Sequence, residues 1–376
     1  MQKIVYLDNG ATTKVDERVA RKIEDVFLRN YGNASSMHLM GREARNSLDD
    51  ARKIIKKRLN AKQVIFTSGG SESDNLAIKG VAYVNGKGHI ITSKIEHPAV
   101  LRTCEALEKE GFEVSYLDVD DKGMLNSKDV EGAIRKETIL VSVMAANNEI
   151  GTIQDIEEIG KICRKKNVVF HTDAVQAFTK LEIDMKKMNI DLLSLSGHKL
   201  HGPKGIGVLA FGSDVKIKRL IDGGGQEFKL RAGTENVPGA VGFAEAAKLV
   251  KEEDVKMMEK LRDKIINTVL KEIPDTKLNG HRTKRLVNNA HFSFKGVEGE
   301  SLGGYLYGKG ICTSTGSACA SLSAEPSHVL TAIGLDKELA SGSMRITLSK
   351  FTTEEEVDYF LMELPKIVKK LRKFSF

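Results

Sequence analysis

Short β-rich runs alternate with amphipathic helical patterns over the first two thirds of the chain. The runs lie at 63–67, 89–92, 112–118, 138–146, 167–172, 191–196 and 206–211. Apolar residues at helical spacing are found between them, at about 73–84, 98–110, 127–136 and 155–166. This alternation predicts an α/β domain with a mostly parallel sheet. Because ligands of such folds bind at the carboxyl ends of the strands, we look first at the polar residues that follow the runs.

The pattern changes after residue 235. One long helical pattern covers about 237–272, and strand-like pieces follow at 289–295, 311–314 and 344–348. A final helix is predicted to begin near Thr353, which has capping-box spacing to Glu356. Its apolar stripe is Val357, Phe360, Leu361, Leu364, Val368 and Leu371. We expect a large domain over 16–250 and a smaller α+β domain formed by 1–15 and 251–376.

The composition is that of an ordinary globular protein. The chain has 376 residues, of which 41% are hydrophobic and 29% charged, so no disulfide or metal is needed to hold a core. Four cysteines are too few for a disulfide scaffold, and because they form no C-x-x-C pair a thiolate zinc site is not expected either. The N-terminus lacks an apolar secretory core, and no apolar stretch approaches the ~20 residues of a membrane helix. We therefore expect a cytoplasmic protein without a membrane partner.

The net charge is +7, from 58 basic and 51 acidic residues. Basic residues are scattered and mostly lie near acidic ones, which favours solubility over nucleic-acid binding. One dense basic cluster, at residues 366–373, closes a segment that opens with three glutamates, an order that suits a helix dipole. No direct nucleic-acid partner is expected.

The segment 67–75, TSGGSESDN, is a candidate phosphate loop. The two usual nucleotide-binding glycine patterns, G-x-x-x-x-G-K-[ST] and G-x-G-x-x-G, are absent from the sequence. Here a strand is predicted to end at Thr67 and a helix to start after Ser71. Glycine backbone, a hydroxyl and a helix N-terminus would then meet an anion. The alternative is that Ser71 or Ser73 only caps the helix.

Two further strand ends carry chemistry. Asp173 would lie at the tip of a buried strand, where a carboxylate is costly unless it meets a cation. Lys199 follows the strand at 191–196 amid glycines, which suits Schiff-base chemistry; the alternative is a solvated loop lysine like Lys204. A lysine for an aldehyde, a carboxylate for a pyridinium nitrogen and a Gly/Ser loop for a phosphate together match pyridoxal phosphate.

Eleven motifs across nearly the whole chain make the sequence closely resemble a known family. They are YLDNGATT (6–13), GNASSMH (32–38), TSGGSESDN (67–75), IEHPAVL (95–101), NNEIGTIQ (147–154), HTDAVQ (171–176), SGHKLHGPKGIG (196–207), GGGQE (223–227), RAGTENV (231–237), STGSACAS (314–321) and MRITLSKFTTEEEVD (344–358). They resemble the NifS/IscS-type (group I) cysteine desulfurases of the class V aminotransferase group, which are fold-type I pyridoxal phosphate enzymes. The resemblance implies a seven-stranded, mostly parallel sheet flanked by helices, a smaller α+β domain and a homodimer.

The resemblance also implies roles at the reacting centre. Lys199 would bind the cofactor aldehyde and move the Cα proton, and Asp173 would pair with the ring nitrogen. His97 would stack on the ring and shuttle protons; the alternative is a buried loop histidine. Gln176 would donate to the ring hydroxyl.

Other residues would hold phosphate and substrate. The phosphate cradle would consist of Gly70, Ser71, Ser196, His198 and, from the neighbouring subunit, Thr234. Asn148 would bind the cofactor, and Asn148 and Arg345 would hold the substrate carboxylate. Arginine suits this role because its guanidinium can bind a carboxylate through two N–H groups.

Cys319 decides the reaction that the resemblance implies. It lies among small residues in a stretch, about 314–326, that is typical of a mobile loop, and it matches the family's persulfide-forming nucleophile. The enzyme would convert L-cysteine to L-alanine and pass sulfur to an iron–sulfur scaffold or a tRNA-thiolation protein. Cys104, Cys163 and Cys312 are expected to be structural, with a resolving thiol at Cys312 as the alternative.

Two departures and three rivals stay open at this stage. Gly70-Ser71 stands where Ala-Thr is common in the family, and the chain stops soon after the last helix, at Phe376, which leaves the sulfur acceptor in doubt. The rivals are a selenocysteine lyase, a transaminase of the same group, which would need no thiol, and a non-catalytic scaffold or RNA-binding protein.

Overall fold

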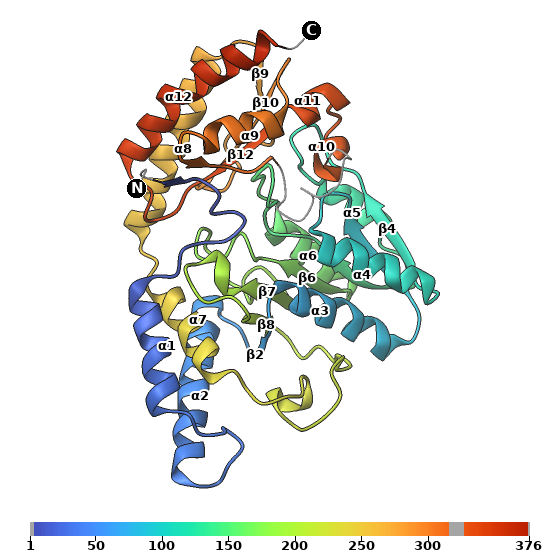
Figure 1. Ribbon diagram of the computed structural model, residues 1–376. Helices are drawn as coiled ribbons and strands as arrows, with labels where there is room; N and C mark the ends of the chain where they lie inside the picture. Colours follow the sequence, from blue (N-terminus) through green and yellow to red (C-terminus); the bar gives the residue numbers. More distant parts are fainter. Residues whose placement is uncertain (1–3, 316–326, 375–376) are drawn as a thin grey trace.

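The computed structural model describes residues 4–315 and 327–374, and a seven-stranded sheet forms its centre (Figure 1). The strands follow the order β2-β8-β7-β6-β5-β3-β4 across the sheet, and β8 alone runs antiparallel to its neighbours. Their bounds are β2 Gln63–Thr67, β3 His89–Ser93, β4 Glu113–Leu117, β5 Thr138–Ser142, β6 Val169–Asp173, β7 Leu192–Ser196 and β8 Gly207–Phe211. Each apolar run became one strand, which confirms the predicted fold class.

Helices cover both faces of this sheet. On one side α3 (Gly70–Asn85) lies over β5, β7 and β8 and contacts α4 (Pro98–Lys109). On the other, α1 (Glu17–Arg29) and α2 (Leu39–Leu59) contact α7 (Val237–Lys248), and α6 (Ile156–Lys166) contacts α5 (Ser127–Ala133). Side chains alternate along the strands, so that Ile65 packs on one face of the sheet and Val64 and Phe66 pack on the other. This burial on both faces explains the nearly continuous apolar runs.

A second core lies beside the sheet and contains both early and late residues. The antiparallel sheet β12-β10-β9 packs with α8 and α12, which lie side by side in Figure 1. Val5 and Leu7 join this core, where β1 pairs with β11 in parallel. The elements are β1 Val5–Tyr6, α8 Glu252–Glu272, β9 Thr276–Leu278, β10 Asn289–Phe294, α9 Gly299–Tyr307, β11 Ile311–Cys312, α10 His328–Ala332, α11 Lys337–Ser341, β12 Ser343–Thr347 and α12 Glu354–Arg372. The domain boundaries at residues 15 and 250 stay a prediction.

Two helix predictions have clear outcomes. The long pattern at 237–272 is wrong as one helix, because α7 ends at Lys248 and α8 begins anew at Glu252. The backbone N–H of Lys251 donates to the Asp254 carboxylate at 3.0 Å, which caps α8. The capping box at Thr353 and Glu356 is present, and the apolar stripe of α12 is buried. Among residues 4–315 and 327–374, no helix combines the length and the hydropathy that crossing a bilayer requires.

Candidate active site

A cavity of about 220 Å³ lies where β6 and β7 end. Four of the residues expected at the reacting centre line it: Lys199, Asp173, His97 and Gln176. Six of those expected to bind phosphate or carboxylate also line it: Gly70, Ser71, Ser196, His198, Asn148 and Arg345. Thr234 is exposed and does not line the cavity that the described residues form. Cys319 lies outside the described residues.

Lys199 is held by the N-terminal segment. It ends a 3₁₀ turn, Gly197–Lys199, directly after β7. Its Nζ donates to the carbonyl oxygens of Gly10 at 2.6 Å and Ala11 at 2.7 Å. Lys204, in contrast, is exposed. The alternative of a solvated loop lysine is therefore wrong for Lys199.

Asp173 is a buried carboxylate at the carboxyl end of β6. Its Oδ1 accepts a hydrogen bond from the Val175 N–H at 2.9 Å. Burial raises the pKa of Asp173, while the Val175 hydrogen bond and the Lys199 charge oppose this shift. Asp74 on α3 lines the same cavity, and burial and the Asp173 charge raise its pKa well above the usual value. Two buried carboxyl groups thus share the cavity, and the nearby Lys199 charge favours the ionised form of Asp173.

His97 caps α4 through its ring. Its Nδ1 accepts from the Ala99 N–H at 3.1 Å, which places the proton of the neutral ring on Nε2. Burial, helped by the charges of Lys199 and His328, lowers the pKa of His97 to about 4. The imidazole is therefore neutral near pH 7 and can donate from Nε2.

The turn between β2 and α3 places Gly70 and Ser71 against the cavity. Gly69 is the N-cap of α3 and makes no side-chain cap bond. The Ser73 hydroxyl instead donates to the Gly69 carbonyl at 3.1 Å and pairs with Thr67 Oγ1 at 2.7 Å, which holds the turn. Neither serine caps the helix, so that alternative is wrong. Ser71 lines the cavity at the positive end of the helix dipole, a favourable place for an anion.

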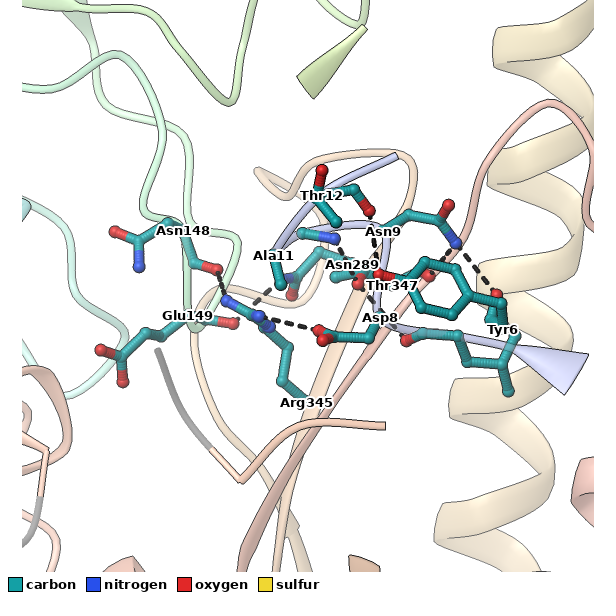
Figure 2. Close-up of polar contacts among 12 residues, drawn as sticks. Tyr6, Asp8, Asn9, Ala11, Thr12, Asn148, Glu149, Asn289, Arg345 and Thr347 are labelled. Carbon is teal, nitrogen blue, oxygen red and sulfur yellow. Dashed lines mark hydrogen bonds and ion pairs between the residues drawn. The ribbon is translucent and has the colours of Figure 1, made fainter. Parts of the chain in front are cut away.

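Arg345 on β12 is 1% exposed and reaches the cavity from the second core (Figure 2). Its Nη1 donates to the Asn148 carbonyl oxygen at 2.8 Å. Its Nη2 forms an ion pair with Asp8 at 3.0 Å. Asn148 follows Asn147, whose side-chain oxygen accepts from two backbone N–H groups and shapes the turn.

The comparisons with known proteins agree with this geometry. The sequence model of the family described as Aminotransferase class-V matches residues 5–360. Curated relatives include "Cysteine desulfurase IscS" of Methanosarcina thermophila, 53% identical over 99% of this chain and 94% of the relative. The protein of the same name from Clostridium botulinum (strain Hall) is 51% identical over 100% of this chain and 97% of the relative. The chain belongs to the class V aminotransferases and, among them, to the cysteine desulfurases.

Solved structures of cysteine desulfurase relatives share the fold. A "NIFS-LIKE PROTEIN" superposes with a TM-score of 0.91 at 40% identity, covering 98% of this chain and 100% of that one. A structure titled "SspA in complex with cysteine" gives 0.83 at 40% identity, covering 93% and 99%. These comparisons support a cysteine desulfurase and neither the selenocysteine lyase nor the transaminase. As a family member the chain is an enzyme, which excludes the non-catalytic rival.

Both ends of the stretch that carries the expected desulfurase nucleophile are anchored beside the cavity. Ser314 exchanges two backbone hydrogen bonds with Arg345, of 2.7 and 3.3 Å. At the other end, Ser327 Oγ donates to Glu149 at 2.5 Å, and His328 Nε2 pairs with the Glu96 carbonyl at 2.9 Å. In the chain, Glu149 directly follows the cavity residue Asn148, and Glu96 directly precedes the cavity residue His97.

The three cysteines in the described residues are poor thiolates. Cys104 and Cys163 are buried free thiols, and burial raises the pKa of each to about 12. Cys312 is half-buried on β11, where burial and the Asp8 charge raise its pKa. A raised pKa lowers the thiolate fraction, which disfavours nucleophilic or resolving chemistry at these sulfurs.

Several residues in or beside the cavity had no role in the sequence analysis. Gly10 and Ala11 bind Lys199 through their carbonyls, Asp8 pairs with Arg345, and Asp74 lies near Asp173. Motif 6–13 contributed to the resemblance, but backbone carbonyls leave no residue-type signal. Asp74 lies in the TSGGSESDN motif, whose other polar residues gave no signal that set it apart.

Proposed function

We propose that this enzyme is a pyridoxal phosphate-dependent cysteine desulfurase that converts L-cysteine to L-alanine and transfers the sulfur to Cys319 as a persulfide. One observation carries the proposal: Lys199, the buried Asp173 and Arg345 line one cavity. Ser314, which begins the stretch that carries Cys319, is hydrogen-bonded through its backbone to that same arginine. Cys319 is the fifth residue after Ser314 in the sequence.

The residues present suit the cofactor that class V aminotransferases use. The Lys199 amine would bond its aldehyde, and Asp173 would pair with its ring nitrogen. The N-terminal N–H groups of α3 and the Ser71, Ser196 and His198 side chains would bind its phosphate, with Asn148 and Gln176 supporting the ring. His97 would cover the ring. When bound, pyridoxal phosphate stabilises the negative charge that develops at the substrate Cα.

Lys199 moves the Cα proton in this proposal. The carbonyl oxygens of Gly10 and Ala11 orient its Nζ, because both accept hydrogen bonds from it. His97 contributes only its Nε2 side, since Nδ1 is occupied by the Ala99 N–H. Any proton that His97 shuttles must therefore pass through Nε2.

Arg345 positions the substrate and Cys319 takes the sulfur. The guanidinium binds the carboxylate of L-cysteine and orients its sulfur. The Cys319 thiolate attacks that sulfur, an S–S bond forms, and the substrate Cβ–S bond breaks. The electron pair of the broken bond stays on carbon, which is protonated and leaves as L-alanine.

We also propose a homodimer and a protein acceptor for the sulfur. Large apolar side chains are exposed on α1, on α2 and on the connection between them: Phe27, Leu28, Tyr31, Met37 and Leu39. Large exposed apolar side chains are typical of interfaces, so a second copy would cover this surface. The family resemblance has Thr234 serve the neighbouring cavity in such a dimer. The acceptor would be an iron–sulfur scaffold or a tRNA-thiolation protein, in the cytoplasm, where a persulfide-forming thiol stays reduced.

The test replaces the nucleophile and the lysine separately. Cys319→Ser should retain the cofactor absorbance but lower sulfide release from L-cysteine at least about a hundredfold and abolish the protein persulfide, measured by mass spectrometry. Lys199→Ala should lose the absorbance of the covalently bound cofactor. Cys312→Ser is the matched control and should behave like the wild type. Persulfide on a different cysteine, with turnover intact in Cys319→Ser, would refute the assignment.

A further inference from the structure

Asp8 occupies one side of the guanidinium that lines the cavity. Its Oδ1 lies 3.0 Å from Arg345 Nη2, and Figure 2 shows the pair with the Asn148 contact on the other nitrogen. Both side chains are largely shielded from solvent, with 19% of the Asp8 and 2% of the Arg345 side chain exposed. Charge–charge interactions at such a place are screened weakly.

Hydrogen bonds to Thr347 determine where Asp8 lies. Thr347, two residues after Arg345 on the same strand, donates its N–H to the Leu7 carbonyl at 2.7 Å. Its hydroxyl accepts from the Gly10 N–H at 2.7 Å, and its carbonyl accepts from the Asn9 amide at 2.9 Å. A Cβ on Gly10 would come within 3.2 Å of Arg345 Cζ. The strand that carries the arginine therefore also anchors the segment that carries the aspartate.

The guanidinium still has an unused donor. Within the residues that the structure describes, the buried Arg345 Nε has no hydrogen-bond partner. An arginine binds a carboxylate best through two adjacent N–H groups. Nε supplies one such group, and both Nη nitrogens already pair with protein oxygens, those of Asn148 and Asp8. A carboxylate that docks there arrives beside the negative charge of Asp8.

We propose that Asp8 is a positioning residue that orients Arg345 and, by competing for its charge, limits how tightly the enzyme holds the carboxylates of substrate and product. The inference rests on the proposed function, in which Arg345 binds those carboxylates. Asp8 keeps the buried guanidinium paired when the cavity holds no amino acid. Its repulsion of the bound carboxylate favours release of L-alanine.

If Asp8 had only a structural role, removing its charge would change the carboxylate affinity in the opposite direction. If Asp8 only held Arg345 in place, removing its charge would loosen the guanidinium and weaken carboxylate binding. If Asp8 competes, removing its charge strengthens that binding. Two like charges about 6 Å apart at an effective dielectric constant of about 20 repel enough for a change of about tenfold or more.

The experiment measures binding to the holoenzyme of Asp8→Asn, which keeps an acceptor oxygen at the same place. L-alanine and L-alaninamide are titrated while the cofactor absorbance is followed. We expect L-alanine to bind about tenfold more tightly to the variant than to the wild type, with L-alaninamide, which lacks the carboxylate, unchanged. Product inhibition of desulfuration by L-alanine should strengthen equally. Asp118→Asn, at an exposed carboxylate, is the matched control for net charge.

L-alanine affinity that is unchanged or weaker in Asp8→Asn overturns the inference. Asp8→Ser also removes the charge and must shift the affinity in the same direction, which keeps the test valid if the asparagine variant is unstable. A wild-type holoenzyme that produces no L-alanine from L-cysteine would instead overturn the proposed function, and the two failures are thus distinguishable.

Discussion

Individual side chains around the cavity are kept uncharged by burial. The pKa of His171 falls to about 3, and its ring pairs with Ser142 and Ser194 as a neutral group. Burial raises the pKa of Glu96 to about 8, against the opposing hydrogen bonds from Ser93 at 2.5 Å and from the Met144 N–H at 3.0 Å. With these groups neutral, Asp173, Lys199 and Arg345 supply the charge at the cavity, which favours ionic contacts with a cofactor and a substrate.

Glu96 yields a pH-dependent prediction. Because its folded-state pKa lies above the unfolded value, it stabilises the fold fully below about pH 4.3, and this contribution is lost as the pH rises toward 8. The free energy of unfolding, measured by urea denaturation, should fall from pH 5 to pH 8 in the wild type by up to about 1.4 kcal/mol per pH unit more than in Glu96→Gln. Glu182→Gln is the surface control. A pH-independent difference between Glu96→Gln and the wild type would show that Glu96 does not take up a proton on folding.

At the scale of elements, the phosphate turn depends on close contact between two antiparallel strands. Gly207 begins β8 and pairs with Thr67 at the end of β2. A Cβ at Gly207 would lie 2.5 Å from the Gly69 carbonyl carbon, so the backbone of the turn leaves no room for a side chain. The glycine of β8 thus sets the position of the N-terminus of α3.

Gly207→Ala should therefore weaken cofactor binding. The methyl group must push the Gly69 turn away from the cavity, and we expect the dissociation constant of pyridoxal phosphate to rise at least about tenfold, as for the loss of one or two phosphate contacts. Equilibrium dialysis or fluorescence titration measures it. Gly132→Ala on α5, where a Cβ has open space, is the control and should leave binding unchanged. Unaltered affinity in Gly207→Ala would mean that the turn is not the phosphate site.

At the scale of the whole molecule, one buried arginine joins the two cores. Arg285 is 2% exposed and donates to the carbonyl of Ile150 at 2.6 Å, to that of His281 at 3.0 Å and to the Asn279 carbonyl. Burial lowers its pKa to about 9. Since Ile150 lies two residues after Asn148, this arginine supports the turn that faces Arg345.

Arg285→Met should lower both stability and substrate affinity. The variant leaves at least two buried carbonyl oxygens without a donor, which predicts a loss of about 3 kcal/mol in the free energy of unfolding. The loosened Asn148 turn should raise the KM for L-cysteine more than it lowers kcat. Arg282→Met, at the exposed arginine three residues earlier, is the control. Equal denaturation midpoints for Arg285→Met and the wild type would contradict the proposed role.

Local sequence patterns were enough to predict much of the fold and several residues of the site. Seven apolar runs became seven strands because each is buried on both faces, and the Thr353 capping box works through residues three apart. Asp173, Lys199 and Ser71 were found because strand ends and a helix start can be read from neighbouring residues. Their roles as cofactor ligands rest on the family resemblance and stay predictions.

Tertiary structure decided what depends on distant segments. The break between α7 and α8 was missed because Lys251 and Asp254 carry no strong stop signal within an apolar helical pattern. The carbonyls of Gly10 and Ala11 reach Lys199 across nearly 190 positions, and Asp8 meets Arg345 across more than 330. Hydrophobic periodicity shows only which face of an element is buried, and not which distant residue that face meets. The contacts of Lys199 and Arg345 with the N-terminal segment therefore could not be predicted from the sequence pattern, because they form only when the two cores pack around the cavity.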